Sequence, residues 1–272
     1  MRRRHDEEVA WVSESRIGEE PPRTGVGRRV GSVVKELLIV VVGAVVVSSL
    51  LRAFVAQPFV IPSGSMEDTL QIDDKVVVQK VTDFSRGDVV VFVDPGDWLG
   101  PEYEAAERGP AGQVLEFIGI LPDTSSNHLI KRVIGMPGDT VHCCDDQGRL
   151  SVNGVPLEEE DYLYRGDDGE PVAPADVPFT VVVPRDRIFV MGDHRNDSRD
   201  SRCHLADVPA AGGPIGTEAF VPVQNVVGPA FLIAAPFDRF QRLTVPDTFA
   251  RIPDPAEPAP EQAVIEPEGV SC

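Results

Sequence analysis

The chain of 272 residues is poor in cysteine and in cations, and each shortage excludes a class of protein. Its four cysteines are too few to build a small disulfide-bonded scaffold. Its 25 lysines and arginines face 44 acidic residues, and the net charge of −19 argues against nucleic acid as a partner, because phosphates need clustered cations. The hydrophobic fraction of 42% is too low for a protein that crosses a membrane many times.

The cysteines leave two interpretations open. Cys143 and Cys144 are adjacent, and neighbours in a chain cannot easily bond to each other without local strain. A bond from one of them to Cys203 is therefore the alternative to free thiols.

Long apolar runs are scarce as well, and the charge-free stretch 37–51 stands out. Extended to 33–56, it can cross a membrane, which takes about 20 residues. It begins far from the N-terminus and no clear A-x-A site follows it, so an uncleaved signal anchor is predicted. Residues 1–32 have mixed charge and no apolar period, which predicts a disordered tail. Cations precede the apolar segment more than they follow it, which predicts that this tail lies in the cytoplasm and the remaining chain outside.

Short β-branched runs fill residues 57–245 and predict a mainly β domain. We expect an antiparallel β-sandwich or partly open barrel, since sustained helical spacing is lacking there. Two interruptions are expected, an acidic insertion at about 94–128 and a second β region at about 143–186. Residues 246–272, rich in Pro and Glu, predict a disordered C-terminal tail. The expected strands are 75–80, 88–93, 129–134, 179–183, 187–191 and 225–233.

Ser65 is a candidate nucleophile, because it lies on a turn restrained by Pro62 and Gly64 directly after the apolar segment. A plain turn is the competing interpretation. The G-x-S-x-G pattern is absent around Ser65, so an α/β-hydrolase has no support. A serine hydroxyl also needs a base. Histidine is the usual one, and the candidates are His128, His194 and His204.

Lys131 is the other candidate base. Side chains alternate along a strand, so Lys131 shares a face with Leu129 and Val133 while Arg132 points the other way. A lysine among apolar neighbours loses hydration, which lowers its pKa and lets it accept a proton. A lysine on an edge strand, whose charge only prevents the strand from pairing with another chain, fits the same pattern.

The polar run 192–202 follows the strand expected at 187–191. It is either a solvated loop or a network in which Ser198 orients a lysine amine while Asp200 and Arg202 pair. Asp193, His194 and Asp197 are too loosely spaced for a known metal site, so neither a metal nor another cofactor is expected.

Four segments together resemble the bacterial type I signal peptidases, serine peptidases with a Ser/Lys dyad. They are IPSGSMEDTL at 61–70, RGDVVVF at 86–92, HLIKRVIGMPGDTV at 128–141 and GDHRNDSRDSR at 192–202, and the tails are similar to those of actinobacterial members. The resemblance implies Ser65 as nucleophile, Lys131 as general base, Ser63 and the Ser65 N–H as the oxyanion hole, and Ser198 as the group that orients the lysine. It also implies substrate-pocket and supporting roles. The pocket residues would be Ile61, Met66, Leu70, Leu129 and Ile130, and the supports Asp193, Arg195, Asp200 and Arg202.

The same resemblance implies the substrate and the location. Signal-peptide-bearing preproteins would be cut at Ala-x-Ala-type sites on the outer face of the cell membrane, with membrane lipid as a partner and the export translocon as a candidate one. Two alternatives remain open. One is a membrane-anchored Ser/His hydrolase, and the other is a membrane-tethered β module that binds partners without catalysis.

Overall fold

The computed structural model describes residues 26–96, 98–99, 109–110, 112, 128–209, 212–267, 269–270 and 272. Most of the acidic insertion predicted at 94–128 lies outside these residues, as does the predicted tail up to residue 25. The chain divides into two units, Met1–Ala44 and Val45–Cys272.

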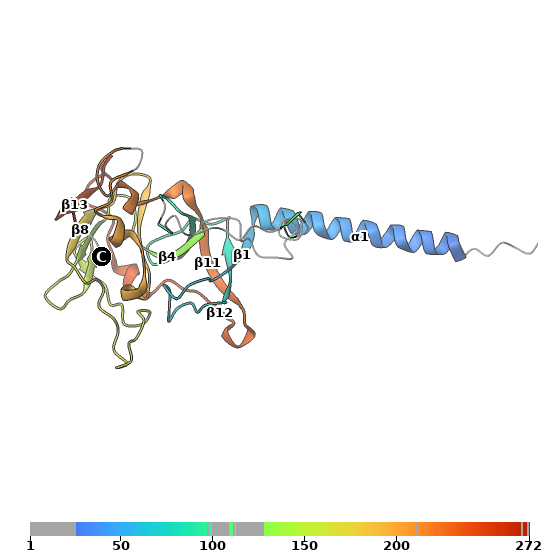
Figure 1. Ribbon diagram of the computed structural model, residues 1–272, viewed down its shortest axis with the longest axis horizontal. Coiled ribbons are helices and arrows are strands. Elements are labelled where there is room, and N and C mark those ends of the chain that lie inside the picture. The colour runs from blue at the N-terminus through green and yellow to red at the C-terminus, as the bar shows by residue number, and fades with distance from the viewer. Residues whose placement is uncertain are drawn as a thin grey trace, which may run out of the picture. The chain divides into compact units, whose positions relative to one another are not determined.

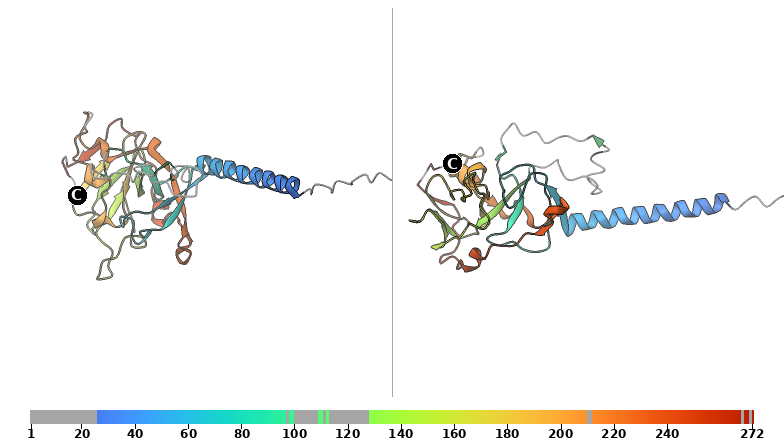
Figure 2. Two further views of the ribbon diagram at one scale, coloured as in Figure 1. Left: turned by 45° about the vertical axis from the view of Figure 1, so that its right-hand side comes forward. Right: turned by 90° about the horizontal axis from the view of Figure 1, so that it is seen from below.

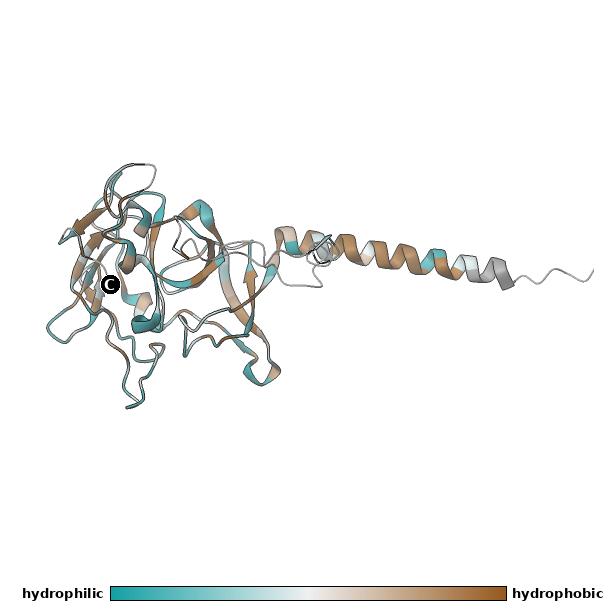
Figure 3. Cartoon of the chain, viewed as in Figure 1, coloured by the Kyte–Doolittle hydropathy of each residue, from teal (hydrophilic) through white to brown (hydrophobic). Residues whose placement is uncertain are grey.

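Helix α1, Val26–Phe54, contains the apolar segment. Its part Gly31–Phe54 has 24 residues with a mean hydropathy of 2.5. At about 1.5 Å per residue this is long enough to cross about 30 Å of hydrocarbon, and Figure 3 shows hydrophobic colours along most of it. The helix begins inside the predicted tail 1–32, because no proline follows Pro22 until Pro58 to interrupt it.

The larger sheet is open, antiparallel and eight-stranded, which confirms the mainly β prediction (Figure 1). The predicted strands agree with the observed ones to within two residues at either end. Six strands follow the order β1-β2-β11-β3-β4-β9, β10 pairs with β9, and β12 pairs with β11. The bounds are Ala56–Val60 for β1, Lys75–Gln79 for β2, Val89–Val93 for β3, His128–Gly135 for β4, Arg187–Met191 for β9, Val221–Pro222 for β10, Val226–Ala235 for β11 and Gln241–Arg242 for β12.

A second, five-stranded sheet has the order β13-β8-β5-β6-β7. Its strands are β5 Thr140–Cys143, β6 Leu150–Val152, β7 Val155–Pro156, β8 Phe179–Val182 and β13 Val264–Glu266. Four of them lie in the chain between β4 and β9, so this sheet is the second β region expected at about 143–186. Figures 1 and 2 show β8 and β13 at the end of the β-rich unit away from β1.

The prediction of a disordered C-terminal tail is wrong. The 3₁₀-helix η6, Asp247–Arg251, buries Phe249 against the core of the second sheet, and Ile252 joins the same core. Strand β13 then pairs antiparallel with β8. The Pro/Glu-rich composition concealed these few apolar side chains, which fill a core that the residues up to 245 leave incomplete.

Neither interpretation of the cysteines, free thiols or a bond from Cys143 or Cys144 to Cys203, agrees with the structure. Cys143 pairs with Cys144, and Cys203 pairs with Cys272. Cys143 lies on β5 inside the core of the second sheet, whereas Cys203 lies in the 3₁₀-helix η2, Ser201–His204. The returning C-terminal segment supplies the partner of Cys203.

Strand β4 is buried on both faces. Ile130 packs in a cluster with Phe59, Met66 and Leu70, while Val133 packs in another cluster with Val90 and Val190. The charged residues between them, Lys131 and Arg132, are therefore both removed from water, with 3% of each residue exposed.

Candidate active site

The segment that carries Ser65 is a pair of tight turns anchored by apolar side chains. Glu67 N–H donates to Gly64 O at 3.0 Å, and Leu70 N–H donates to Met66 O at 2.7 Å. Ile61, Met66 and Leu70 are buried in the core beneath the turns. These three were predicted to line the substrate pocket. The structure shows that they anchor the turn, and their contact with substrate stays a prediction, as it does for the half-buried Leu129 and the buried Ile130.

The two residues predicted to form the dyad meet at this turn. Lys131 Nζ on β4 donates to Ser65 Oγ at 2.5 Å, although 66 positions separate them in the chain. Both residues are buried, Ser65 with 7% and Lys131 with 3% exposed. A hydroxyl in direct contact with an amine is the arrangement that an activated nucleophile needs.

The environment of Lys131 favours its neutral form. Burial lowers the pKa of the ammonium from 10.5 to about 8, and the charge of Arg202 acts in the same direction. The carboxylates of Asp200 and Asp193 oppose the shift without cancelling it. A lysine with a pKa of about 8 is neutral in a useful fraction of molecules near neutral pH, so it can accept a proton from Ser65.

Gly192 leaves room for the backbone of Ser65 and for the side chain of Ser198. Strand β9 pairs with β4 as far as Met191, which faces Arg132, and then leaves the sheet. A Cβ on Gly192 would collide with the backbone oxygen of Ser65 and with Ser198 Oγ. Sequence reasoning missed this position. The available signal was a glycine directly after a predicted strand, which often marks a close approach of another backbone.

Asp200 organises the loop behind the lysine. Its carboxylate accepts from the Gly192 N–H at 2.9 Å, from Ser198 Oγ at 2.7 Å and from Arg202 Nη2 at 2.8 Å. Burial raises the pKa of Asp200, but the Arg202 charge and these hydrogen bonds outweigh it, so the net pKa lies below 3.8. The structure thus pairs Asp200 with Arg202 as expected. Within the described residues, the Ser198 hydroxyl donates to Asp200 and makes no hydrogen bond to Lys131, so its lysine-orienting role stays a prediction.

Asp193 and Arg195 are held by partners that the sequence analysis did not single out. Asp193 Oδ2 accepts from Arg132 Nη2 and from Thr69 Oγ1, both at 2.6 Å. Arg195 Nη2 donates to Glu159 Oε1 at 2.6 Å, and its Nε donates to Gly192 O at 2.8 Å. Glu159 lies in the loop after β7, and no local signal marked it.

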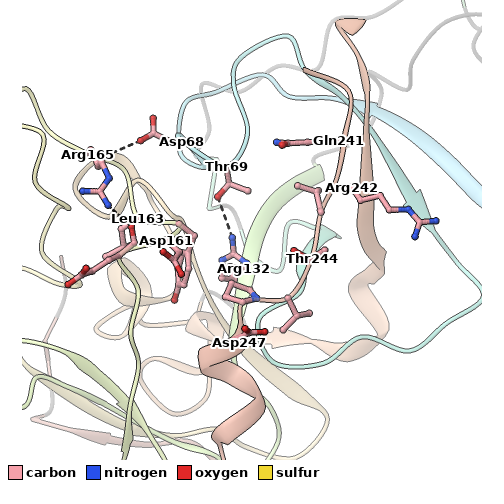
Figure 4. A pocket seen from close by; sticks show the side chains of 15 residues that line it. Asp68, Thr69, Arg132, Asp161, Leu163, Arg165, Gln241, Arg242, Thr244 and Asp247 are labelled. Atoms are coloured by element: carbon pink, nitrogen blue, oxygen red, sulfur yellow. Dashed lines mark hydrogen bonds between the residues drawn. The ribbon is translucent and has the colours of Figure 1, made fainter. Parts of the chain in front are cut away.

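Arg132 points to the side of β4 opposite Lys131, as strand alternation predicts. Its guanidinium lies 4.3 Å from the centre of the Tyr162 ring, beside an open cavity of about 670 Å³ (Figure 4). The walls are mostly polar, and Thr69 and Arg132 face each other there. Arg132 lines this cavity, whereas Ser65 and Lys131 do not.

Within the described residues, the side-chain contact observed at Ser65 Oγ is with Lys131, and the candidate histidines make the following contacts. His194 Nδ1 lies 3.2 Å from Gly64 O, His204 Nδ1 lies 2.6 Å from Asp207 Oδ2, and the His128 ring packs edge-on against Phe59. The described part of the chain also contains no group of three or more His, Cys, Asp or Glu residues that could hold a metal ion. Ser63, the other predicted oxyanion donor, is exposed beside the turn.

The model of the peptidase S26 family, signal peptidase, matches residues 34–235. The chain belongs to this signal peptidase family. It is 35% identical to "Probable signal peptidase I" of Mycobacterium leprae over 84% of this chain and 83% of that one. It is 38% identical to "Signal peptidase I" of Mycobacterium tuberculosis over 77% of this chain and 75% of that one. These relatives confirm the resemblance to actinobacterial signal peptidases.

A cyanobacterial relative, "Probable signal peptidase I-2" of Synechocystis, is 33% identical over 77% of each chain. A crystal structure of a signal peptidase I from Enterococcus faecalis aligns with a TM-score of 0.32 and 23% identity over 55% of this chain and 97% of that one, a similarity too low to carry an argument. As a member of the S26 family, the protein is a serine endopeptidase. The apolar helix α1 fits the membrane-anchored character of the family.

Proposed function

We propose that this signal peptidase removes signal peptides from exported preproteins at Ala-x-Ala-type sites by acyl transfer, with Ser65 as nucleophile and Lys131 as general base. The observation that carries the proposal is the 2.5 Å contact between Lys131 Nζ and Ser65 Oγ in a buried setting. The family supports signal-peptide cleavage. The geometry and the lowered pKa of Lys131 support the dyad.

In the acylation step, neutral Lys131 takes the Ser65 proton while Oγ attacks the scissile carbonyl carbon. The carbonyl oxygen gains the negative charge, and the Ser65 N–H and the Ser63 hydroxyl stabilise it. The intermediate then expels the amine of the mature protein, which takes the proton from Lys131. The signal peptide is left as an ester on Ser65.

Deacylation repeats the sequence with water. Neutral Lys131 accepts a proton from a water molecule, the hydroxide adds to the ester carbonyl, and the second tetrahedral intermediate expels Ser65 Oγ. Lys131 returns the proton to Ser65, which restores the starting state. The signal peptide leaves as a carboxylic acid, so one water molecule is consumed for each peptide bond cut.

The membrane completes the proposal. Helix α1 anchors the protein as a single-pass segment with the N-terminus in the cytoplasm and the catalytic domain outside. Lipid would keep the site near the emerging cleavage point, and the export translocon is a candidate partner. Cysteine labelling with a membrane-impermeant reagent, at one introduced cysteine on each side of α1, tests the orientation. Labelling of the N-terminal position in intact cells would contradict it.

The dyad is tested by cleavage of an Ala-x-Ala preprotein with the purified full chain in detergent and lipid. We expect wild type and Lys75→Met, a change at an exposed lysine on β2, to cut after the Ala at −1. Ser65→Ala and Lys131→Met should show no cleavage. Cleavage by Lys131→Met would remove Lys131 as the base, and a folded wild type without cleavage would overturn the proposed function.

A further inference from the structure

His194 contacts the turn that carries Ser65, called the nucleophile turn below, through both its ring and its backbone. Its ring nitrogen Nδ1 lies 3.2 Å from Gly64 O. Its backbone N–H donates to Ser65 O, also at 3.2 Å. The peptide units before and after Ser65 are thus both held by residue 194. A turn that must present a hydroxyl and an N–H in fixed directions gains from such a double hold.

The bond to Gly64 O acts on the proposed oxyanion donor itself. Gly64 C=O and Ser65 N–H belong to the same planar peptide unit and point in opposite directions. Fixing the oxygen therefore fixes the direction of the Ser65 N–H. A hydrogen bond accepted by the carbonyl also polarises the unit and makes its N–H a stronger donor.

The proton on His194 can be assigned by elimination. A carbonyl oxygen only accepts, so Nδ1 must donate. The Glu67 carboxylate lies 3.4 Å from the same nitrogen and favours the proton there as well. Nδ1 is protonated both in this neutral tautomer and in the imidazolium, so the contact does not depend on which of the two is present. A ring nitrogen that already carries its proton and faces Gly64 cannot be the base for Ser65.

The surroundings hold the ring in place. Tyr164 stacks on His194 with ring centres 3.7 Å apart. The two chain neighbours are locked as well, Asp193 by Arg132 and Arg195 by Glu159. The ion pairs of its two neighbours thus hold the backbone of His194 in place while its ring contacts the turn.

We propose that His194 is a positioning residue of the oxyanion hole, which aligns and polarises the Gly64–Ser65 peptide through its Nδ1–H. This inference rests on the proposed function, because it assigns the Ser65 N–H to the oxyanion. The gain appears where the charge develops, in the transition state, and not in substrate binding.

Kinetics with four variants test the proposal. His194→Phe keeps a ring for Tyr164 and removes the donor. We expect kcat to fall roughly tenfold, the effect of one hydrogen bond lost in the transition state, with KM changed less than about twofold. His194→Asn and His194→Leu have similar shape and lose the ring alike, but only Asn carries a donor nitrogen on Cγ, where His carries Nδ1, so Asn should keep a kcat at least about threefold above Leu. His142→Phe, at an exposed site on β5, should match wild type.

A wild-type kcat in His194→Phe, or equal kcat values in the Asn and Leu variants, would overturn the proposal. The Asn and Leu pair decides the question if the Phe variant does not fold, and thermal unfolding of each variant checks this.

A second measurement needs no cleavage and so separates this inference from the proposed function. The sequence has two Gly-Ser pairs, at 31–32 and 64–65. Labelling glycine with ¹³C at the carbonyl carbon and serine with ¹⁵N gives two resonances in a carbonyl-selective NMR experiment. In His194→Phe the 64–65 resonance should shift and the 31–32 resonance should not. An unmoved 64–65 resonance would overturn the inference even if wild type cleaves its substrate.

Discussion

The backbone oxygen of Ser65 lies so close to Gly192 that any side chain at position 192 would collide with it. Gly192 also donates its N–H to Asp200 and accepts from Arg195 through its carbonyl, so it cannot move aside without breaking both bonds. The turn that carries Ser65 and the loop behind Lys131 can thus approach each other this closely only because residue 192 has no side chain. This close approach explains why a residue without reactive groups belongs to the site.

Gly192→Ala should therefore disable the enzyme. The added methyl group would displace Ser65 or Ser198, and a shift of about 1 Å at reacting atoms can cost 100-fold in rate. We expect kcat/KM to fall at least about 100-fold, and overpacking to cost about 1–3 kcal/mol of stability. Gly109→Ala is the control, because, among the described residues other than its chain neighbours, no heavy atom lies within 4 Å of the position its Cβ would take. Comparable activity in the two variants would contradict the close approach.

The pH dependence of activity should follow the Lys131 ammonium. The base works only when neutral, and its pKa is lowered to about 8 by burial. The value of kcat/KM should therefore rise with pH, reach half its limit near pH 8 and fall about tenfold for each unit below pH 7. A pH–rate profile with a short Ala-x-Ala peptide measures this. A half-maximum near pH 6.5 would point to a histidine instead.

The buried pair of Arg195 and Glu159 should be costly to break from one side. Burial lowers the pKa of Arg195, but the Glu159 charge outweighs it and raises the net pKa, so the guanidinium stays charged. Removing its partner with Glu159→Gln leaves that charge buried, and we expect a loss of about 3–5 kcal/mol in the free energy of unfolding.

Urea unfolding followed by the fluorescence of buried Trp98 measures this loss. Arg185 and Glu261 form a pair whose side chains are 56% and 74% exposed, so Glu261→Gln is the matched control and should leave stability unchanged. Equal midpoints for Glu159→Gln and Glu261→Gln would show that the buried pair contributes nothing.

Phe249 should be needed for the second sheet, although it lies in a segment whose composition suggests disorder. It is 4% exposed within the core there, and its ring occupies the space that a side chain at position 87 would need. Phe249→Ala should cost about 3–5 kcal/mol of stability because it leaves a cavity. Phe237→Ala is the control, since Phe237 is 89% exposed. A Phe249→Ala variant as stable as the control would restore the interpretation of a disordered tail.

The sequence predicted the strands well because β-branched runs between Gly, Pro and Asp are local signals. It could not predict Glu159 under Arg195, or Thr69 beside Asp193, because those contacts join segments 36 and 124 positions apart. Ser65 and Lys131 were selected only by combining motifs with a family resemblance, since each alone fits an ordinary turn or an edge strand. The C-terminal segment was misjudged because average composition hid Phe249 and Ile252.

Lys131 and Arg132 are neighbours on β4 whose side chains point to opposite faces, Lys131 toward Ser65 and Arg132 toward Asp193. A shift of one residue in the strand register therefore changes which side chain reaches each partner. A slip of one residue in one direction would present a permanently charged guanidinium to Ser65, and a slip in the other direction would place the ammonium beside Asp193. Deleting or inserting one residue within β4 would therefore do more harm than most substitutions there. Over evolutionary time, the length of this strand should vary less than its apolar residues do.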